Sequence, residues 1–357
     1  MPDLEYLIPT RRIKKYAVVT INNTSSYATA NPHVQLIEIT HYDLEYILGI
    51  ELSPYEVPFY IYFYDPNQNT LAYSWYDYFD GTYHYWWVKT PQISAGSTYN
   101  IYMIYDSTAV QLDGNYVGIN PYYAYYVKGL LPTYGQYDNG TNVFYYYWNW
   151  AGTSLPSGWT ASVSGGGSYS VNNGLTLTVP SGGGGSVSYS SFTIPSIGIW
   201  SREWFEINQC CGCSGGNDWT RVFNTSTSGD SYMISLFAYG GSYDAIFKFV
   251  SGSEDLINRA STSCGAGKAG FSDVVWIYTN NGYWYVYEQP DNVLVTATDS
   301  TYSPSQIVSL LIGIASPASG TASYTAYPVY FADAPLSYNV VNGVPVIIPY
   351  TTFAPAD

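Results

Sequence analysis

The chain has 357 residues, of which 42 are tyrosine, and 10% are charged, against about 25% in an ordinary soluble domain. A formal charge of −15 argues against a nucleic-acid-binding protein, because phosphates require a basic surface. No apolar run reaches the roughly 20 residues of a membrane span, and the length suits two domains. The surface must therefore be covered by Tyr, Ser, Thr, Asn and Gly, and tyrosine supplies both a ring that packs and a hydroxyl that hydrogen-bonds.

The low charge also indicates the environment that the protein suits. At pH ~2–3 Asp and Glu are largely neutral, whereas Tyr, Ser and Thr do not titrate there. We therefore expect an acidic, hot exterior, as in a thermoacidophile. The first residues lack the basic-then-apolar order of a signal peptide, so we expect either a removed signal or release with a virus particle.

Apolar side chains alternate with a period of two, which predicts strands rather than helices. In Phe59–Tyr64 the tyrosines fall on one face and the Phe and Ile residues on the other, and Tyr283–Tyr287 alternates similarly. Asn-Gly and Asp-Gly pairs, which suit type I′ turns, separate such segments. The clearest predicted hairpin joins Val274–Thr279 to Tyr283–Tyr287. The pattern predicts an all-β protein.

Gly/Ser-rich and turn-rich segments indicate how the chain is divided into domains. Two Gly/Ser-rich stretches, Ser164–Ser168 and Ser181–Ser186, flank a predicted strand at Gly174–Val179, so we expect mobile loops within one domain. The polar, turn-rich run Gly129–Asn142 is a better domain boundary. Pro304–Ala315 is predicted as either a short helix or a buried strand.

The four cysteines are candidates for two disulfides. Four cysteines allow three pairings, and a bridge between the adjacent Cys210 and Cys211 would form a strained ring. We favour Cys211–Cys264 with Cys210–Cys213, a pairing whose loop of about 50 residues would contribute roughly 3–4 kcal/mol. A zinc site made by all four thiolates is the alternative, although adjacent ligands fit the usual spacing poorly.

Four segments carry a sequence signature in the first half of the chain: Tyr62–Asp65, Asn69–Tyr73, Trp86–Thr98 and Tyr99–Tyr105. They resemble a domain of unknown function that is common in archaeal and bacterial surface proteins. Tyr137–Phe144 and Gly152–Trp159 resemble the junction that leads, in such proteins, into a concanavalin A-like sandwich.

This resemblance implies an all-β fold with two antiparallel β-sandwich domains, of jelly-roll or concanavalin A-like type, in tandem. We expect the first domain at 1–130, the second at 131–335 and a tail at 336–357. The tail contains a β-prone run, Val340–Pro349, with two prolines, which confine a strand to a sheet edge. We interpret it as an edge strand of this chain's own sandwich. A strand donated to a neighbouring subunit is the alternative.

Catalytic signatures are weak. A retaining glycosidase needs two carboxyls about 5 Å apart, and the E-x-D-x-E segment typical of such sandwiches does not occur. In the nearest segment, Arg202–Glu206, a spacing of three puts Glu203 and Glu206 on opposite strand faces, and we expect one exposed and one paired with Arg202. No G-x-S-x-G elbow accompanies the histidines. These histidines are His33, His41 and His84. We expect no catalytic residue, metal or cofactor.

Sugar binding suits this composition better, because aromatic rings stack on sugar faces. The candidate sugar-binding residues in the second half are Trp148, Trp150, Trp204 and Trp219. The N-glycosylation sequons begin at Asn22, Asn23, Asn139 and Asn224.

These observations favour a non-enzymatic extracellular structural or adhesion protein, most specifically a capsid, turret or fibre component of an archaeal virion. We expect it to associate with itself or with other virion or surface subunits through tyrosine-rich faces, and to contact host glycans. The alternative is a monomeric carbohydrate-binding module, or an adhesin or filament subunit of a cell surface. A glycoside hydrolase is less favoured.

Overall fold

The computed structural model describes residues 14–107, 111–195, 198–207, 219–238, 242–262, 270–279, 281–289, 292–314, 316–317, 320–334, 337–341 and 344–355. The chain divides into two compact units. Unit 1 is Met1–Val143 with Ser337–Asp357, and unit 2 is Phe144–Leu336.

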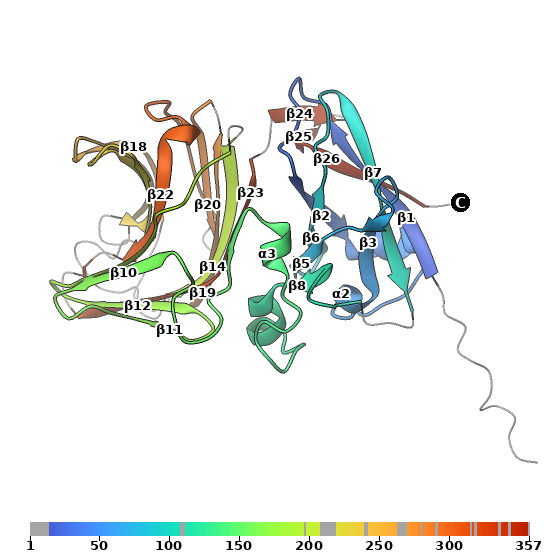
Figure 1. The fold of residues 1–357 in the computed structure, drawn as a ribbon, viewed down its shortest axis with the longest axis horizontal. Coiled ribbons are helices and arrows are strands. Elements are labelled where there is room, and N and C mark those ends of the chain that lie inside the picture. The colour runs from blue at the N-terminus through green and yellow to red at the C-terminus, as the bar shows by residue number, and fades with distance from the viewer. Residues whose placement is uncertain are drawn as a thin grey trace, which may run out of the picture. The chain divides into compact units, whose positions relative to one another are not determined.

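Unit 1 is a sandwich of two sheets (Figure 1). In its described residues, a five-stranded sheet has the order β26-β1-β7-β3-β4 and a four-stranded sheet the order β2-β6-β5-β8. The pairs are antiparallel except β5 with β8. The strands are β1 (Lys14–Asn23), β2 (His33–Thr40), β3 (Ile61–Asp65), β4 (Thr70–Leu71), β5 (Ser74–Phe79), β6 (Tyr83–Thr90), β7 (Ser97–Asp106), β8 (Val117–Ile119) and β26 (Tyr350–Pro355). The helical segments are α1 (His41–Leu48), α2 (Val57–Tyr60), the π-helical turn η2 (Tyr123–Val127) and α3 (Gly140–Val143).

The alternation of side chains explains the core of unit 1. Ala17, Val19 and Ile21 of β1 are fully buried between the sheets, while the intervening side chains face outward. Helix α1 begins where the Thr40 hydroxyl accepts a 3.0 Å bond from the amide of Asp43. It ends at Gly49, which adopts the left-handed φ of 57°.

Unit 2 is the larger sandwich, and its two sheets face each other (Figure 1). Among the residues described, one sheet has the order β10-β13-β22-β15-β16-β17-β18, and the other β11-β12-β23-β14-β19-β20-β21, with β9 also paired to β23. The strands are β9 (Tyr146–Trp148), β10 (Trp159–Ser164), β11 (Ser168–Val171), β12 (Leu175–Pro180), β13 (Gly184–Tyr189), β14 (Gly198–Ile207), β15 (Trp219–Thr225), β16 (Ser231–Phe237), β17 (Tyr243–Val250), β18 (Ser253–Ser261), β19 (Gly270–Thr279), β20 (Tyr283–Gln289), β21 (Val293–Thr298), β22 (Ile307–Ile314) and β23 (Thr321–Asp333). The two sheets bury one large apolar cluster between them.

The predicted all-β class with two antiparallel sandwiches is confirmed. The predicted hairpin is present as β19 and β20, with Tyr278 opposite Trp284. Both alternatives for Pro304–Ala315 occur in part, because the 3₁₀ turn η3 (Pro304–Gln306) precedes β22. The stretch Ser181–Ser186 differs from the expected loop, since Gly184 already begins β13. Phe59 and Tyr60 likewise lie in α2 rather than in a strand.

The units are divided differently from the expected domains. The boundary falls after Val143, directly beyond the turn-rich run Gly129–Asn142, whereas the first domain was expected to end at residue 130. The expected separate tail returns to unit 1, where β26 pairs antiparallel with β1 at the sheet edge. The described strands of the run Val340–Pro349 differ from the expected edge strand, because β25 (Val344–Ile348) pairs with β24 (Ser337–Val341) in a separate two-stranded sheet.

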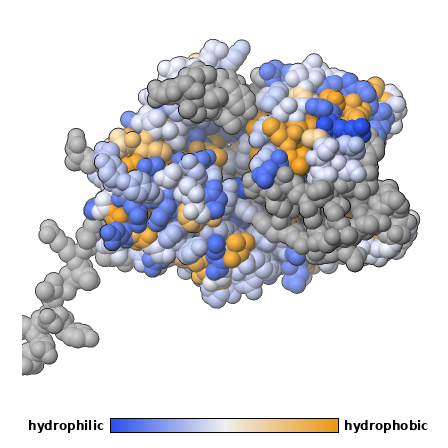
Figure 2. Space-filling view, turned by 180° about the vertical axis from the view of Figure 1, so that it is seen from behind, coloured by the Kyte–Doolittle hydropathy of each residue, from blue (hydrophilic) through white to orange (hydrophobic). Residues whose placement is uncertain are grey.

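Much of one described face of the molecule has middling hydropathy. Figure 2 shows a face that is mostly pale, with strongly hydrophilic and hydrophobic residues scattered in small groups. Within the described ranges, no helix has the length and hydropathy needed to cross a membrane.

Candidate functional site

The outer face of the five-stranded sheet in unit 1 carries a group of tyrosines. The antiparallel register places Tyr64 of β3 opposite Tyr102 of β7, and Tyr62 opposite Ile104. On the other side of β7, Ile104 lies opposite Tyr16 of β1. Because side chains alternate along each strand, these residues share one face of the sheet, on which Tyr62 is buried at 6% exposed and Tyr16 is open to solvent.

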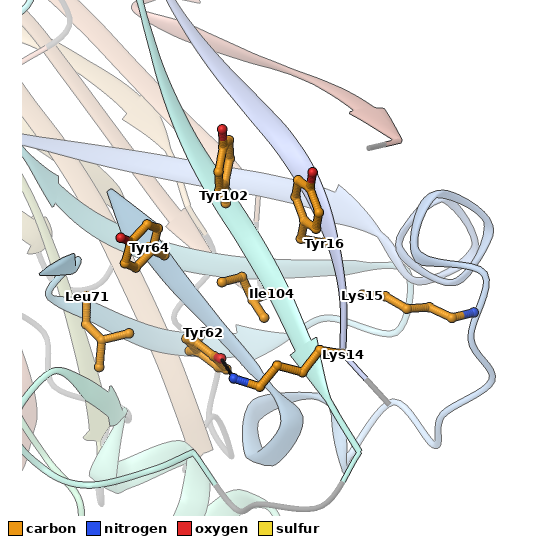
Figure 3. A pocket seen from close by; sticks show the side chains of 8 residues that line it. All are labelled: Lys14, Lys15, Tyr16, Tyr62, Tyr64, Leu71, Tyr102 and Ile104. Atoms are coloured by element: carbon orange, nitrogen blue, oxygen red, sulfur yellow. Dashed lines mark hydrogen bonds between the residues drawn. The ribbon is translucent and has the colours of Figure 1, made fainter. Parts of the chain in front are cut away.

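Their rings line an open groove of ≈ 460 Å³, which we call the tyrosine groove (Figure 3). The ring centroids of Tyr16 and Tyr102 are 5.1 Å apart, and those of Tyr102 and Tyr64 are 6.4 Å apart. Each ring is thus held by its neighbour, while Tyr16 remains 44% exposed. The lining residues are Lys14, Lys15, Tyr16, Tyr62, Tyr64, Leu71, Tyr102 and Ile104.

One cationic group lies at the end of this groove. The Lys14 Nζ donates a 3.1 Å hydrogen bond to the Tyr62 hydroxyl and lies 3.5 Å from Asp106 Oδ2 (Figure 3). The Asp106 side chain is fully buried, whereas that of Lys14 is half exposed. Lys15 points away and donates to the Gly49 carbonyl oxygen. Lys14 therefore keeps donor capacity toward the groove.

A second groove of ≈ 410 Å³, the polar groove, is also lined by Leu71 of β4. Tyr73 and Tyr116 line it as a stacked pair, with centroids 4.8 Å apart and planes 14° apart. Lys89 Nζ lies 6.0 Å from the Tyr73 ring centroid and donates to the Asn142 carbonyl oxygen. Burial lowers the pKa of Lys89.

The polar groove also offers hydrogen-bonding groups. The side chains of Asn31, Gln68 and Thr70 line it and make no hydrogen bond with any residue that the structure describes. Asp65, in contrast, is fully engaged, because Oδ1 accepts from two backbone amides and Oδ2 accepts from Tyr99 at 2.6 Å. Two amides and a hydroxyl beside stacked rings can bind a ligand rich in hydroxyl groups.

The histidines do not form a catalytic set in the described part of the chain. His41 Nδ1 and His84 Nε2 are 3.0 Å apart, and His84 Nδ1 is 2.9 Å from the Tyr76 hydroxyl. His84 is fully buried, and burial, followed by His41, lowers its pKa to about 3. His33 is buried against Gln35. No group of three metal-ligating side chains occurs among the described residues.

The carboxylate segment in unit 2 is part of the core rather than of a cleft. Glu203 of β14 is fully buried and pairs with Arg221 of β15, in the opposite sheet, not with Arg202 as expected. Tyr324 donates to the same carboxylate and accepts a 3.0 Å bond from Arg221. Burial raises the pKa of Glu203, while Arg221 and Tyr324 oppose the shift. A substrate has no access to this network.

The four candidate tryptophans are buried in unit 2. Their exposed fractions are 8% for Trp148, 0% for Trp150, 5% for Trp204 and 1% for Trp219. Their rings pack on other aromatic or guanidinium groups, so they present almost no surface to a sugar. Sequence reasoning missed the tyrosine groove, although the alternation in Phe59–Tyr64 was its signal.

The sequon side chains differ in accessibility. Asn23 is 1% exposed and donates to the carbonyl oxygens of three residues. Asn139 is also 1% exposed and donates to two carbonyl oxygens. Asn22 and Asn224 are only partly buried. Glycosylation stays a prediction, and the fold favours Asn22 and Asn224 as its sites. The predicted disulfides at Cys210, Cys211, Cys213 and Cys264 lie outside the described residues.

Comparison with known proteins gives one relative by sequence. Uncharacterized protein 562 of Sulfolobus islandicus rod-shaped virus 1 is 30% identical over 134 residues, which are 37% of this chain and 21% of the relative. The chain thus matches about a fifth of that viral protein's length. No family profile matches the chain.

Some solved structures align with about half of this chain and at low sequence identity. The carbohydrate recognition domain of Emp46p, at 11% identity and a TM-score of 0.39, covers 50% of this chain and 89% of its own. The GH43 protein BlXynB from Bacillus licheniformis is 10% identical, with a TM-score of 0.37. Its alignment covers 52% of this chain and 39% of BlXynB. Similarity at this level carries no argument about function.

Proposed function

We propose that the chain is a non-enzymatic protein of a virion exterior that holds sugar rings of host glycans in the tyrosine groove and the adjoining polar groove. The observation that carries the proposal is the row of neighbouring tyrosine rings on the open face of unit 1, with unpartnered amides beyond it. A pocket of mostly apolar walls with a few polar groups is the usual form of a small-ligand site.

The physical fit is to uncharged pyranose rings. Tyrosine offers a rigid apolar face with little entropy to lose, and its hydroxyl bonds to sugar hydroxyls. Lys14 at one end and Asn31, Gln68 and Thr70 at the other supply donors and acceptors. Leu71 lines both grooves, so we expect successive rings of one oligosaccharide to reach both.

The state of the carboxylates at the grooves supports a binding protein rather than a hydrolase. The carboxylates at the grooves, Asp65 and Asp106, are buried and engaged by hydrogen bonds or an ion pair. A hydrolase would need a pair of carboxyls facing the substrate. The viral relative supports a place in a virion.

The test is calorimetric titration of the full chain with neutral oligosaccharides, namely maltohexaose, mannohexaose, cellohexaose and chitohexaose. Tyr16→Ala removes one groove ring, and Tyr169→Ala in unit 2 is the matched control, because both tyrosines are 44% exposed and lie on strands. We expect at least one sugar to bind, with roughly tenfold loss in Tyr16→Ala and no change in Tyr169→Ala.

Absence of binding to every sugar, or equal loss in both variants, would contradict the groove as a glycan site. Release of shortened sugars during the titration would contradict the non-enzymatic assignment.

A further inference from the structure

Strand β26 is the last described element of the chain, yet it completes the first unit. The other strands of the two sheets in unit 1 lie between Lys14 and Ile119, and all of unit 2 intervenes before β26. In the described structure β26 pairs with one strand only, β1, from Ala17 opposite Pro355 to Asn22 opposite Tyr350. Unit 1 therefore depends on a segment that reaches it from far along the chain.

Few side-chain contacts attach β26 to the rest of unit 1 in the described residues. Phe353 is the one β26 residue that packs against the apolar core in the described residues, and Thr352, Ala354 and Pro355 are exposed. The side-chain contacts are a 3.3 Å bond from Asn22 Nδ2 to Thr352 Oγ1 and the packing of Phe353. β26 also lies beside α1, and its backbone ladder to β1 and these contacts are ones that any copy of the same strand reproduces.

The segment that connects unit 2 to β26 is long enough for β26 to contact another copy of the chain. Fifteen residues, 335–349, separate Ala334 of unit 2 from Tyr350, and a fully extended segment of that length spans roughly 50 Å. Ten of them form the hairpin of β24 with β25, which pairs with no other strand that the structure describes. A lone two-stranded hairpin is marginally stable in water, so it can open.

We infer that β26 is exchanged between copies of this chain, so that β1 of one copy accepts β26 of the next. The exchanged pair has the same register and the same contacts as the pair within one chain, so exchange costs little once copies are crowded. Reciprocal exchange closes a dimer, and one-way exchange makes an open string. In dilute solution the strand of the same chain wins, because the connection holds it at high effective concentration.

The experiment uses the full chain with Thr20→Cys and Thr352→Cys, two residues that lie opposite each other in the β1–β26 register. Chains labelled with nitrogen-14 and nitrogen-15 are mixed, incubated at ~1 mM or ~1 μM, and oxidised. Mass spectrometry of the peptide pair joined at the two introduced cysteines then reports whether one chain or two supplied them. Identification by mass separates this bridge from any formed by the native cysteines.

We expect mixed-isotope pairs to approach half of the total at ~1 mM and to vanish at ~1 μM. The control is Thr20→Cys with Asn100→Cys, which joins the same β1 residue to β7 and should give unmixed pairs at both concentrations. If the first variant does not fold, Val18→Cys with Ala354→Cys tests the same register. Unmixed pairs from the β1–β26 bridge at both concentrations would overturn the inference.

Discussion

Replacing Arg221 with methionine would leave the Glu203 carboxylate buried without its cationic partner. Both side chains are at most 1% exposed, and the guanidinium carbon also lies 3.9 Å from the Trp219 ring centroid. Breaking a buried pair at one side costs about 3–5 kcal/mol, because the remaining charge stays desolvated. Arg221→Met should therefore lower the free energy of unfolding of unit 2 by about that amount at pH 7.

The pH dependence follows from the same charge. Burial raises the pKa of Glu203, so an unpaired Glu203 folds more readily in its protonated form. For an acid whose folded pKa is raised, stability falls as pH rises through that pKa. The deficit of Arg221→Met should then be smaller at pH 4.5 than at pH 8.

The assay is hydrogen exchange of β14 and β15 peptides in urea, which reports on unit 2 alone. The double variant Glu203→Leu/Arg221→Met removes both charges, and should recover most of the loss, since apolar replacements of buried pairs are often neutral or stabilising. A single variant that costs under about 1 kcal/mol, or a double variant as unstable as the single one, would refute this reasoning.

Three further predictions concern unit 1 and its sequons. Because His84 has a pKa lowered to about 3, the unfolded chain takes up a proton that the folded chain does not as pH falls below 6.5. Thermal unfolding should therefore show that unit 1 loses stability as the pH falls from 6.5 to 3. His84→Gln should make the stability of unit 1 depend less on pH in this range. An unchanged pH dependence would count against a neutral, buried His84. Asn139→Ala should cost about 1–3 kcal/mol in urea unfolding, because the buried Ser74 carbonyl oxygen loses its side-chain donor, whereas the partly buried Asn115 carbonyl oxygen keeps the Asn142 amide. Asn224→Ala, which loses one bond to the Ser309 hydroxyl, should cost less than about 1 kcal/mol, and equal costs would contradict this ranking.

Local pattern was sufficient for the strands. The alternation in Tyr283–Tyr287 and the Asn-Gly turn before it predicted β20 and its pairing with β19. The same rule failed at Phe59 and Tyr60, where a proline in α2 starts a helical turn before β3. Period-two patterns indicate which face a residue takes, but not where the strand begins.

The sites depended on pairings that a local pattern does not contain. Tyr16, Tyr64 and Tyr102 come together because β1 and β3 both pair with β7, across 86 residues of sequence. Arg221 reaches Glu203 from the opposite sheet, whereas the sequence offered the adjacent Arg202. The tryptophans expected to bind sugar were buried instead, since large rings fill the space between two sheets.

The two units are expected to respond to acid in opposite ways, which bears on the predicted acidic habitat. Because His84 stays neutral when it is buried, unit 1 loses stability as the pH falls. The raised pKa of Glu203 has the opposite effect and makes unit 2 more stable as the pH falls. An acidic, hot exterior therefore stays a prediction, and the pH profile of unfolding of each unit tests it.

The proposed place of this chain in a virion is tested most directly by immunogold electron microscopy of virus particles purified from cultures that produce the chain. Antibodies raised against unit 1 should label the outside of intact particles, and preincubation with the purified chain should abolish the label. Particles that carry no label, with the chain confined to infected cells, would contradict the account.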